Sequence, residues 1–341
     1  MKTARLIIVG FGTVGQGLVQ ILLERAEAIE KRFEVRFQVV GVSDLRFGSL
    51  YDPNGLHLAA LLEAGSQGNL SSVHAAQHGW DMEKMLAQAE ADTLIEASYT
   101  NLETGEPAVT YIRQALLAGK NVVTTNKGPI ALHFPELQAL SAEKGGRLGF
   151  EGTVMSGTPT LALGRNLLAA AGIQRIQGIL NGTTNFILTR MESGSSYAEA
   201  LAEAQALGYA EADPSGDVEG FDAAGKVVIL GNIVMGARLA MADVDRQGIT
   251  HLTQDDIASA KREGKRWKLI GTLEYIDGEI KASVRPTALP LEHPLANVKD
   301  AINAVTYTTD LLGEVTLIGA GAGRTQTGYA LLNDLLAIHT N

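Results

Sequence analysis

The amino-terminal segment constrains the fold of this chain more than any other. Leu6-Ile7-Ile8-Val9 is a continuous apolar run, which is typical of a strand buried on both faces of a parallel sheet. The pattern Gly10-x-Gly12-x-x-Gly15 follows at once, and apolar residues at helical spacing come next. Such glycines permit a tight turn, close approach of backbone to a pyrophosphate and close packing of helix on strand. The segment predicts a dinucleotide-binding strand–turn–helix unit, with a glycine-rich turn without ligand as the alternative.

Strand and helix patterns alternate over the first part of the chain. Strands are expected at residues 37–42, 93–97 and 121–125, and a helix is expected at 109–118. This alternation predicts an α/β fold, a Rossmann-type doubly wound parallel sheet, over residues 1–150.

The composition changes after Glu151, where glycine and threonine gather. A strand and turn at 176–186 and a helix at 197–207 predict a second, α+β domain over residues 151–310. Gly319-Ala-Gly-Ala-Gly323 precedes a further apolar helical pattern. We therefore expect residues 311–341 to return to the first domain.

Composition and charge exclude several classes of function. The 341 residues include no cysteine, which removes disulfides, cysteine-ligated metals and thiol catalysis. The formal net charge of −10 argues against a nucleic-acid-binding surface. No segment is typical of an export signal or a membrane span, so we expect no membrane partner and a cytoplasmic location.

Two residues at the end of the second expected strand bear on the choice of dinucleotide. Asp44 can bind the ribose hydroxyls of NAD, although it lies further from Gly10 than the usual interval of about 20 residues. Arg46 can instead pair with the 2′-phosphate of NADP, or can be a solvated loop charge. Together, the distance of Asp44 from Gly10 and the presence of Arg46 slightly favour NADP over NAD.

Two lysines stand among small polar and apolar residues rather than in a charge run. Lys127 follows an expected strand, so it should lie at the carboxyl end of a sheet, where open α/β sheets bind ligands. Lys226 follows Asp222 by four residues, which places both on one face of a helix. This pair is either a surface ion pair or a partly desolvated lysine that acts as a general acid and base.

Several motifs, in order along essentially the whole chain, resemble those of homoserine dehydrogenases. The most specific is Asn181-Gly-Thr-Thr-Asn185 within the stretch 178–188. The others are Gly10-x-Gly-x-x-Gly15, residues 101–107, Thr125-Asn-Lys127, residues 208–226, His293-Pro-Leu-Ala296 and Gly319–Gly323. The length resembles that of the short monofunctional form without a regulatory domain.

This resemblance implies an NAD(P)-dependent interconversion of L-homoserine and L-aspartate 4-semialdehyde in threonine and methionine biosynthesis. It also implies that the second domain binds substrate and forms a homodimer, and that a structural sodium ion is bound. The implied catalytic residues are Lys226, Lys127 and Asp222, and the implied substrate-binding residues are Glu211, Asp217 and Lys127. The expected cofactor contacts are Gly10, Phe11, Gly12, Thr13, Val14, Gly15, Asp44, Arg46, Ser98, Tyr99, Lys127 and Gly323. The implied sodium ligands are Glu151, Val154, Ser156 and Thr158.

Two other kinds of protein also use a dinucleotide-binding domain. Aspartate-semialdehyde dehydrogenase forms a thioester on a cysteine, and this chain has none. A non-catalytic dinucleotide-sensing protein would not need Lys226 or Glu211. It would be expected to carry a DNA-binding segment, against which the net charge of −10 argues.

Overall fold

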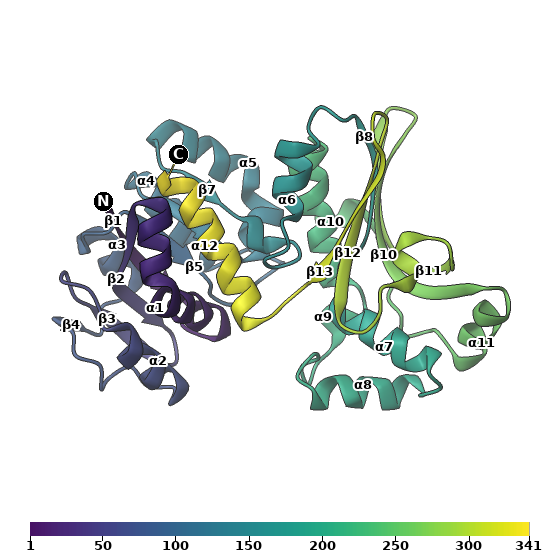
Figure 1. Ribbon diagram of the computed structural model, residues 1–341, viewed down its shortest axis with the longest axis horizontal. Coiled ribbons are helices and arrows are strands. Elements are labelled where there is room, and N and C mark those ends of the chain that lie inside the picture. The colour runs from purple at the N-terminus through teal and green to yellow at the C-terminus, as the bar shows by residue number, and fades with distance from the viewer. Residues whose placement is uncertain (341) are drawn as a thin grey trace. The chain divides into compact units, whose positions relative to one another are not determined.

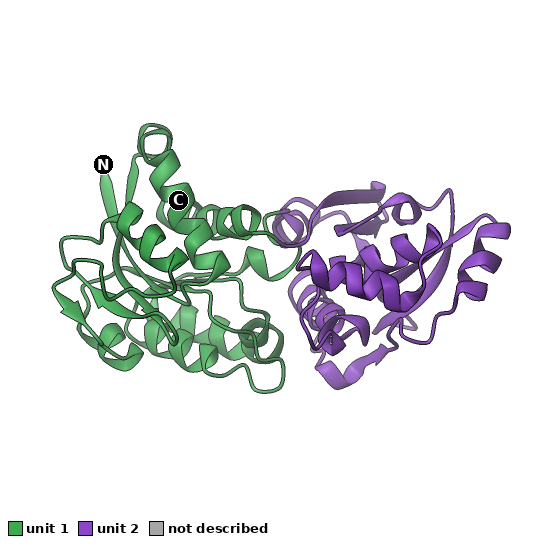
Figure 2. Ribbon diagram, turned by 90° about the horizontal axis from the view of Figure 1, so that it is seen from below, with its two compact units in different colours: residues 1–157, 323–341 green, residues 158–322 purple. Residues whose placement is uncertain are grey.

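The computed structural model describes residues 1–340, which form two compact units (Figures 1 and 2). Unit 1 comprises residues 1–157 and 323–340, and unit 2 comprises residues 158–322. We expected divisions at 150 and 310 instead. The second division falls later because strand β13 (Gly313–Ala320) pairs along its whole length with β12 (Ile302–Thr309) inside unit 2. The segment that belongs with unit 1 is therefore shorter than expected.

Unit 1 is built on a seven-stranded sheet in the order β4-β3-β2-β1-β5-β6-β7. Its strands are β1 (Lys2–Val9), β2 (Val35–Asp44), β3 (Gly48–Tyr51), β4 (Gln77–His78), β5 (Thr93–Glu96), β6 (Asn121–Thr124) and β7 (Leu148–Gly149). The strands from β2 through β1, β5 and β6 to β7 are parallel. The chain leaves β1 for β2 on one side and later reaches β5 on the other. Ligands bind at the carboxyl ends of strands at such a switch point.

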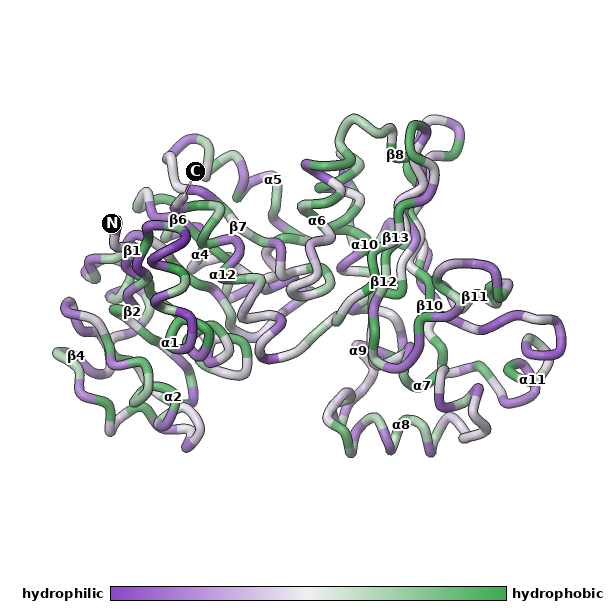
Figure 3. The backbone as a smooth tube through the Cα atoms, viewed as in Figure 1, coloured by the Kyte–Doolittle hydropathy of each residue, from purple (hydrophilic) through white to green (hydrophobic). Residues whose placement is uncertain are grey.

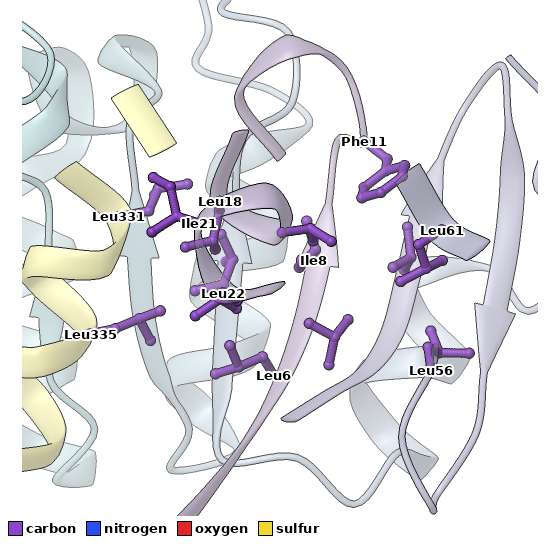
Figure 4. Close-up of a cluster of buried hydrophobic side chains, with 14 of the residues drawn as sticks. Leu6, Ile8, Phe11, Leu18, Ile21, Leu22, Leu56, Leu61, Leu331 and Leu335 are labelled. Carbon is purple, nitrogen blue, oxygen red and sulfur yellow. The ribbon is translucent and has the colours of Figure 1, made fainter. Parts of the chain in front are cut away.

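Helices cover both faces of this sheet. They are α1 (Thr13–Phe33), α2 (Leu58–Ser66), α3 (Met82–Gln88), α4 (Ala108–Leu117), α5 (Lys127–Lys144) and α12 (Arg324–Thr340), with the 3-10 turn η1 (Glu151–Thr153). Leu6 and Ile8 of β1 belong to one hydrophobic cluster, and Ile7 and Val9 belong to another. The predicted burial of this strand on both faces is thus confirmed. Figure 4 shows Leu331 and Leu335 of α12 beside Leu18, Ile21 and Leu22 of α1.

Unit 2 is built on a six-stranded sheet in the order β13-β12-β8-β10-β11-β9. Its remaining strands are β8 (Ile173–Ile179), β9 (Val244–Arg246), β10 (Lys265–Ile276) and β11 (Glu279–Pro290). Its helices are α6 (Thr160–Ala162), η2 (Leu163–Leu167), α7 (Gly182–Glu192), α8 (Tyr197–Ala206), α9 (Ser215–Val218), α10 (Phe221–Val234), η3 (Met241–Asp243), α11 (Gln254–Arg262) and η4 (Pro294–Asn297). Hydrophobic stretches occur in both units (Figure 3). No helix among residues 1–340 is both long and apolar enough to cross a bilayer.

Packing of the carboxyl-terminal helix should contribute strongly to the stability of unit 1. Leu331 is fully buried, so Leu331→Ala should lower the free energy of unfolding by about 2–5 kcal/mol through lost burial and a residual cavity. Urea denaturation measures this change. Leu117→Ala makes the same chemical change at a half-exposed position and should cost less than about 1 kcal/mol. Equal costs for the two variants would contradict the packing of α12 described above.

Candidate functional site

The glycine-rich turn joins β1 to α1 and lies against the end of β5. Gly10 has a φ of +85°, and a Cβ there would lie 2.3 Å from the carbonyl oxygen of Ala97. A Cβ on Gly15 would lie 2.4 Å from the carbonyl oxygen of Gly10, whereas one on Gly12 would meet no atom within 4 Å. The turn therefore requires glycine at two positions for packing and leaves Gly12 open to an approaching ligand.

Asp44 holds this turn from the end of β2. Its Oδ2 accepts the N–H of Phe11 at 2.8 Å, and its Oδ1 accepts the N–H groups of Arg46 and Phe47 at 2.9 and 3.1 Å. The Phe11 side chain is fully buried in the core, so only its backbone is placed to meet a cofactor. The Arg46 guanidinium is exposed and lies 5.8 Å from the Phe47 ring centroid. Thr13 and Val14 open α1, and Gly323 immediately precedes α12.

A second loop follows β5, beside the helix that begins with Lys127. Ser98 lies in this loop, and Tyr99 is 81% exposed. The side-chain amide of Asn126 donates to the carbonyl of Tyr99 at 3.1 Å, and its Oδ1 accepts the N–H of Gly128 at 3.1 Å. Lys127 is the first residue of α5 and follows β6 after only Thr125 and Asn126, which confirms its predicted place at the carboxyl end of the sheet.

Unit 2 holds the other predicted lysine in a largely buried ion pair. Lys226, only 7% exposed, lies on α10 and donates to Asp222 Oδ2 at 2.7 Å and to the carbonyl of Leu180 at 2.6 Å. The four-residue spacing thus produces the predicted contact. The burial excludes the alternative of a solvated surface pair, which would contribute only about 0.3–0.5 kcal/mol.

Asn181 connects this ion pair to a second carboxylate. Its side-chain NH₂ donates to Asp222 Oδ2 at 2.9 Å and to Asp217 Oδ1 at 2.6 Å, while its Oδ1 accepts the N–H of Thr184 at 2.8 Å. Asn181 therefore caps α7 and bridges two acidic residues at once. We assigned no role to Asn181 from the sequence. An asparagine just before a helix indicates a cap, but no local pattern indicates the two long-range contacts.

Asp217 has an altered proton affinity. Its burial and the neighbouring Asp222 carboxylate raise its pKa above the ordinary 3.8, against the opposing effects of Asn181 and Lys226. Asp213, in the preceding loop, differs because the N–H and hydroxyl of Ser215 lower its pKa. The cluster of Lys226, Asp222 and Asp217 therefore carries excess negative charge when both carboxylates are ionised.

Glu211 and the expected sodium ligands are not part of the Lys226 cluster. Glu211 is exposed in the loop after α8, where its carbonyl accepts from Gln205 at 3.0 Å. No hydrogen bond within residues 1–340 joins its carboxylate to the Lys226 cluster. Glu151 and Ser156 are buried in unit 1, and the Ser156 hydroxyl lies 2.7 Å from that of Thr327. Thr158 begins unit 2.

Comparison with known proteins agrees with this architecture. Residues 10–151 match the family model "Homoserine dehydrogenase, NAD binding domain", and residues 159–336 match the model "Homoserine dehydrogenase". The NAD(+)-dependent homoserine dehydrogenase of Pseudomonas canavaninivorans is 47% identical over 99% of this chain and 97% of its own length.

Two solved structures extend the likeness. The homoserine dehydrogenase of Thiobacillus denitrificans has a TM-score of 0.86 at 34% identity, covering 99% of this chain and 73% of that one. A hyperthermophilic archaeal homoserine dehydrogenase mutant in complex with NADPH has a TM-score of 0.84 at 31% identity, covering 98% and 97%.

A Rossmann-type unit with a glycine-rich first turn, joined to a unit with a buried lysine–carboxylate cluster, defines an NAD(P)-dependent oxidoreductase. The family-model matches over both units and the relative at 47% identity narrow this class of enzyme to one family. The chain belongs to the homoserine dehydrogenase family, whose substrates are homoserine and aspartate 4-semialdehyde. The non-catalytic alternative is not favoured, because the matched models and relatives are enzymes of this family.

The raised pKa of Asp217 predicts the sign of a pH effect on stability. Because the folded state holds this proton more tightly than the unfolded state, the group's contribution is complete below about pH 3.8 and is lost as pH rises through the folded pKa. Asp217→Asn should therefore gain stability relative to the native chain between about pH 4 and pH 7. Urea unfolding across this range measures the difference.

Asp213→Asn is the matched control, and its expected trend has the opposite sign. The lowered pKa of Asp213 contributes stability at higher pH, so this variant should lose stability relative to the native chain as pH rises. Parallel trends for the two variants would contradict the description of the Asp217 environment.

Proposed function

We propose that Lys226 is the general acid and base of the alcohol–aldehyde interconversion. The observation that supports this role is the burial of its ammonium between Asp222 Oδ2 and the carbonyl of Leu180. An ammonium has three donors, and these two acceptors use two of them. The remaining N–H can address the hydroxyl or carbonyl oxygen of the substrate.

Proton transfer in each direction then follows from the state of Lys226. The nicotinamide, when bound, accepts or returns the hydride. In homoserine oxidation, neutral Lys226 takes the hydroxyl proton as the C–H bond breaks, and Asp222 stabilises the resulting ammonium. In aldehyde reduction, the ammonium gives the proton to the forming alkoxide.

We further propose that acidic residues hold the substrate's α-ammonium group. Homoserine is a zwitterion, so a fixed negative charge orients it for reaction. Glu211 supplies a carboxylate in an exposed loop, and Asp217 adds charge near Lys226. Lys127, at the start of α5, is proposed to bind substrate and to assist the chemistry beside the nicotinamide.

For the coenzyme, we propose binding along the glycine-rich turn, with NAD preferred to NADP. Asp44 supports this preference because three backbone N–H groups fix its carboxylate at the end of β2, where a 2′-phosphate would be repelled. The relative at 47% identity is also named as NAD(+)-dependent. The NADP preference suggested by the sequence rests on Arg46, and the variants below separate the two.

A structural sodium ion, a homodimer and a cytoplasmic location complete the proposal. Met155 and Ser156 have φ values of 57° and 55°, which curl the loop from Glu151 to Thr158. The expected ligands are all oxygens, with one carboxylate, a set that fits a hard cation.

The edge strand β13 and its turn expose apolar side chains that support self-association, those of Ile318, Leu311 and Leu312.

Loss of Lys226 should affect turnover more than coenzyme binding. Lys226→Ala should lower kcat by about 10²- to 10⁴-fold, the usual range for a general acid or base, with little change in dinucleotide affinity. Steady-state kinetics with homoserine and coenzyme titration measure both. Lys265→Ala, at a half-exposed lysine of unit 2, should keep normal turnover. Near-normal turnover in Lys226→Ala would remove Lys226 from the mechanism.

Loss of charge at Glu211 should act on substrate binding. Glu211→Gln keeps the size of the side chain but deletes its charge, so the KM for homoserine should rise about 10-fold or more while the KM for the dinucleotide stays within about 2-fold. Initial rates at varied homoserine concentration provide the measurement. Glu263→Gln serves as an exposed control. An unchanged homoserine KM would shift the assignment to Asp217 or Asp222.

Coenzyme choice is tested by two variants. Asp44→Asn should lower the ratio of kcat/KM with NAD to kcat/KM with NADP by about 10- to 150-fold, which corresponds to about 1.5–3 kcal/mol. Arg46→Ala should change both coenzymes alike, within about 2-fold. A selective loss of NADP activity in Arg46→Ala, with no shift in Asp44→Asn, would instead support NADP.

A further inference from the structure

Glu96 is a carboxylate buried at the carboxyl end of β5, for which the proposed mechanism has no use. Its side chain is 0% exposed. Its Oε1 accepts both the backbone N–H of Ser98, at 2.9 Å, and the Ser98 hydroxyl, and its Oε2 accepts the Thr124 hydroxyl at 2.8 Å. Glu96 therefore joins the loop that follows β5 to the end of the neighbouring strand β6.

The network continues from Thr124 into the helix that carries Lys127. The Thr124 hydroxyl also accepts the N–H of Asn126 at 2.9 Å. Asn126 in turn donates to the carbonyl of Tyr99 and caps α5 through the N–H of Gly128. The position of Lys127, the first residue of α5, is thus set by the same hydrogen bonds that hold Ser98 and Tyr99.

The glycine-rich turn rests on the same loop. A Cβ at Gly10 would lie 2.3 Å from the carbonyl oxygen of Ala97 and 2.6 Å from the nitrogen of Ser98. The N–H of Gly10 is held by the carbonyl of Ser43 at 2.9 Å. The N–H of Ala97 also donates to the carbonyl of Val9 at 2.8 Å, so the Ala97 end of the loop is held by β1 and the turn, and Glu96 holds the part that follows.

We propose that Glu96 is a positioning residue that fixes the loop of Ser98 and Tyr99 against the amino terminus of α5, and so orients the nicotinamide for hydride transfer. This inference rests on the proposed placement of the nicotinamide beside Ser98, Tyr99 and Lys127. In the proposed binding mode the ADP-ribose half of the coenzyme lies at Gly12 and Asp44, so its binding should be little affected.

The chemistry of the carboxylate explains why an amide is a weaker replacement. Glu96 accepts three hydrogen bonds, and an ionised carboxylate offers four acceptor sites. Glu96 is the acceptor in every contact described for it. Burial raises the pKa of Glu96, and the bonds from Ser98 and Thr124 oppose that rise. Glutamine keeps one acceptor oxygen for Ser98, so its NH₂ faces the Thr124 hydroxyl, which must then accept this hydrogen bond in addition to the one from the N–H of Asn126. The substitution therefore weakens the link between the loop and β6.

Coenzyme analogues separate positioning of the nicotinamide from a general loss of structure. In Glu96→Gln, affinity for ADP-ribose should stay within about 2-fold of the native value, while kcat for homoserine should fall about 10- to 100-fold. Asp52→Asn changes another buried carboxylate of unit 1, whose Oδ1 accepts the N–H of Asn54, and should leave both quantities within about 2-fold. An equal loss of ADP-ribose affinity and turnover, or a Glu96→Gln variant no different from Asp52→Asn, would overturn the inference.

A second pair of variants decides the matter if Glu96→Gln does not fold. Thr124→Val removes the hydroxyl bonded to Glu96 while keeping the shape of the side chain, and Thr124→Ser keeps the hydroxyl. The valine variant should show the lowered kcat with normal ADP-ribose affinity, and the serine variant should recover turnover to within about 3-fold of native. Normal turnover in Thr124→Val, or equal losses in both, would overturn the inference.

Tyr99→Ala and Lys127→Ala show whether the underlying placement holds. If neither changes turnover or NAD affinity, the proposed placement of the nicotinamide fails, and the inference about Glu96 fails with it. If both lower turnover while the Glu96 and Thr124 variants match the control, the placement stands and only the positioning role of Glu96 is wrong.

Discussion

The burial of the Lys226 ammonium connects several elements of unit 2. A charged lysine removed from water is costly unless nearby groups replace its hydration. For Lys226, Asp222 supplies a carboxylate one helical turn away, and the carbonyl of Leu180 supplies a second acceptor just past the end of β8. The amide of Asn181 then fixes Asp222 while capping α7. Helix starts and a strand end are thus tied to a single cation.

Unit 1 must instead let its backbone approach a large ligand closely. The switch point between β1 and β5 brings two loops together, and the absence of a side chain on Gly10 lets them touch. Polar groups at the strand ends, those of Glu96, Thr124 and Asn126, then hold the loops by hydrogen bonds rather than by packing. A rigid scaffold of this kind can present a reactive ring with little reorganisation.

Local patterns predicted much of the fold and part of the site. The apolar run at Leu6–Val9, the glycines after it and the spacing of Asp222 and Lys226 are short-range features, and each has its expected structural consequence. The long hairpin of β10 and β11 was not predicted, because the pattern of buried and exposed residues along it depends on the pairing of β10 with β8. β13 was likewise not recognised, since residues 311–341 were expected to return to the first domain. The roles of Asn181 and Glu96 depend on partners that only folding brings close.

If Lys226 moves the proton of the substrate hydroxyl, as we propose, an external amine should be able to replace it. In Lys226→Ala, added primary amines can enter the space left by the side chain and serve as the base. We expect amines of similar size to restore homoserine oxidation in proportion to their concentration, with larger rate constants for more basic amines. Absence of rescue by every amine, or rescue that does not depend on amine basicity, would contradict this proposal.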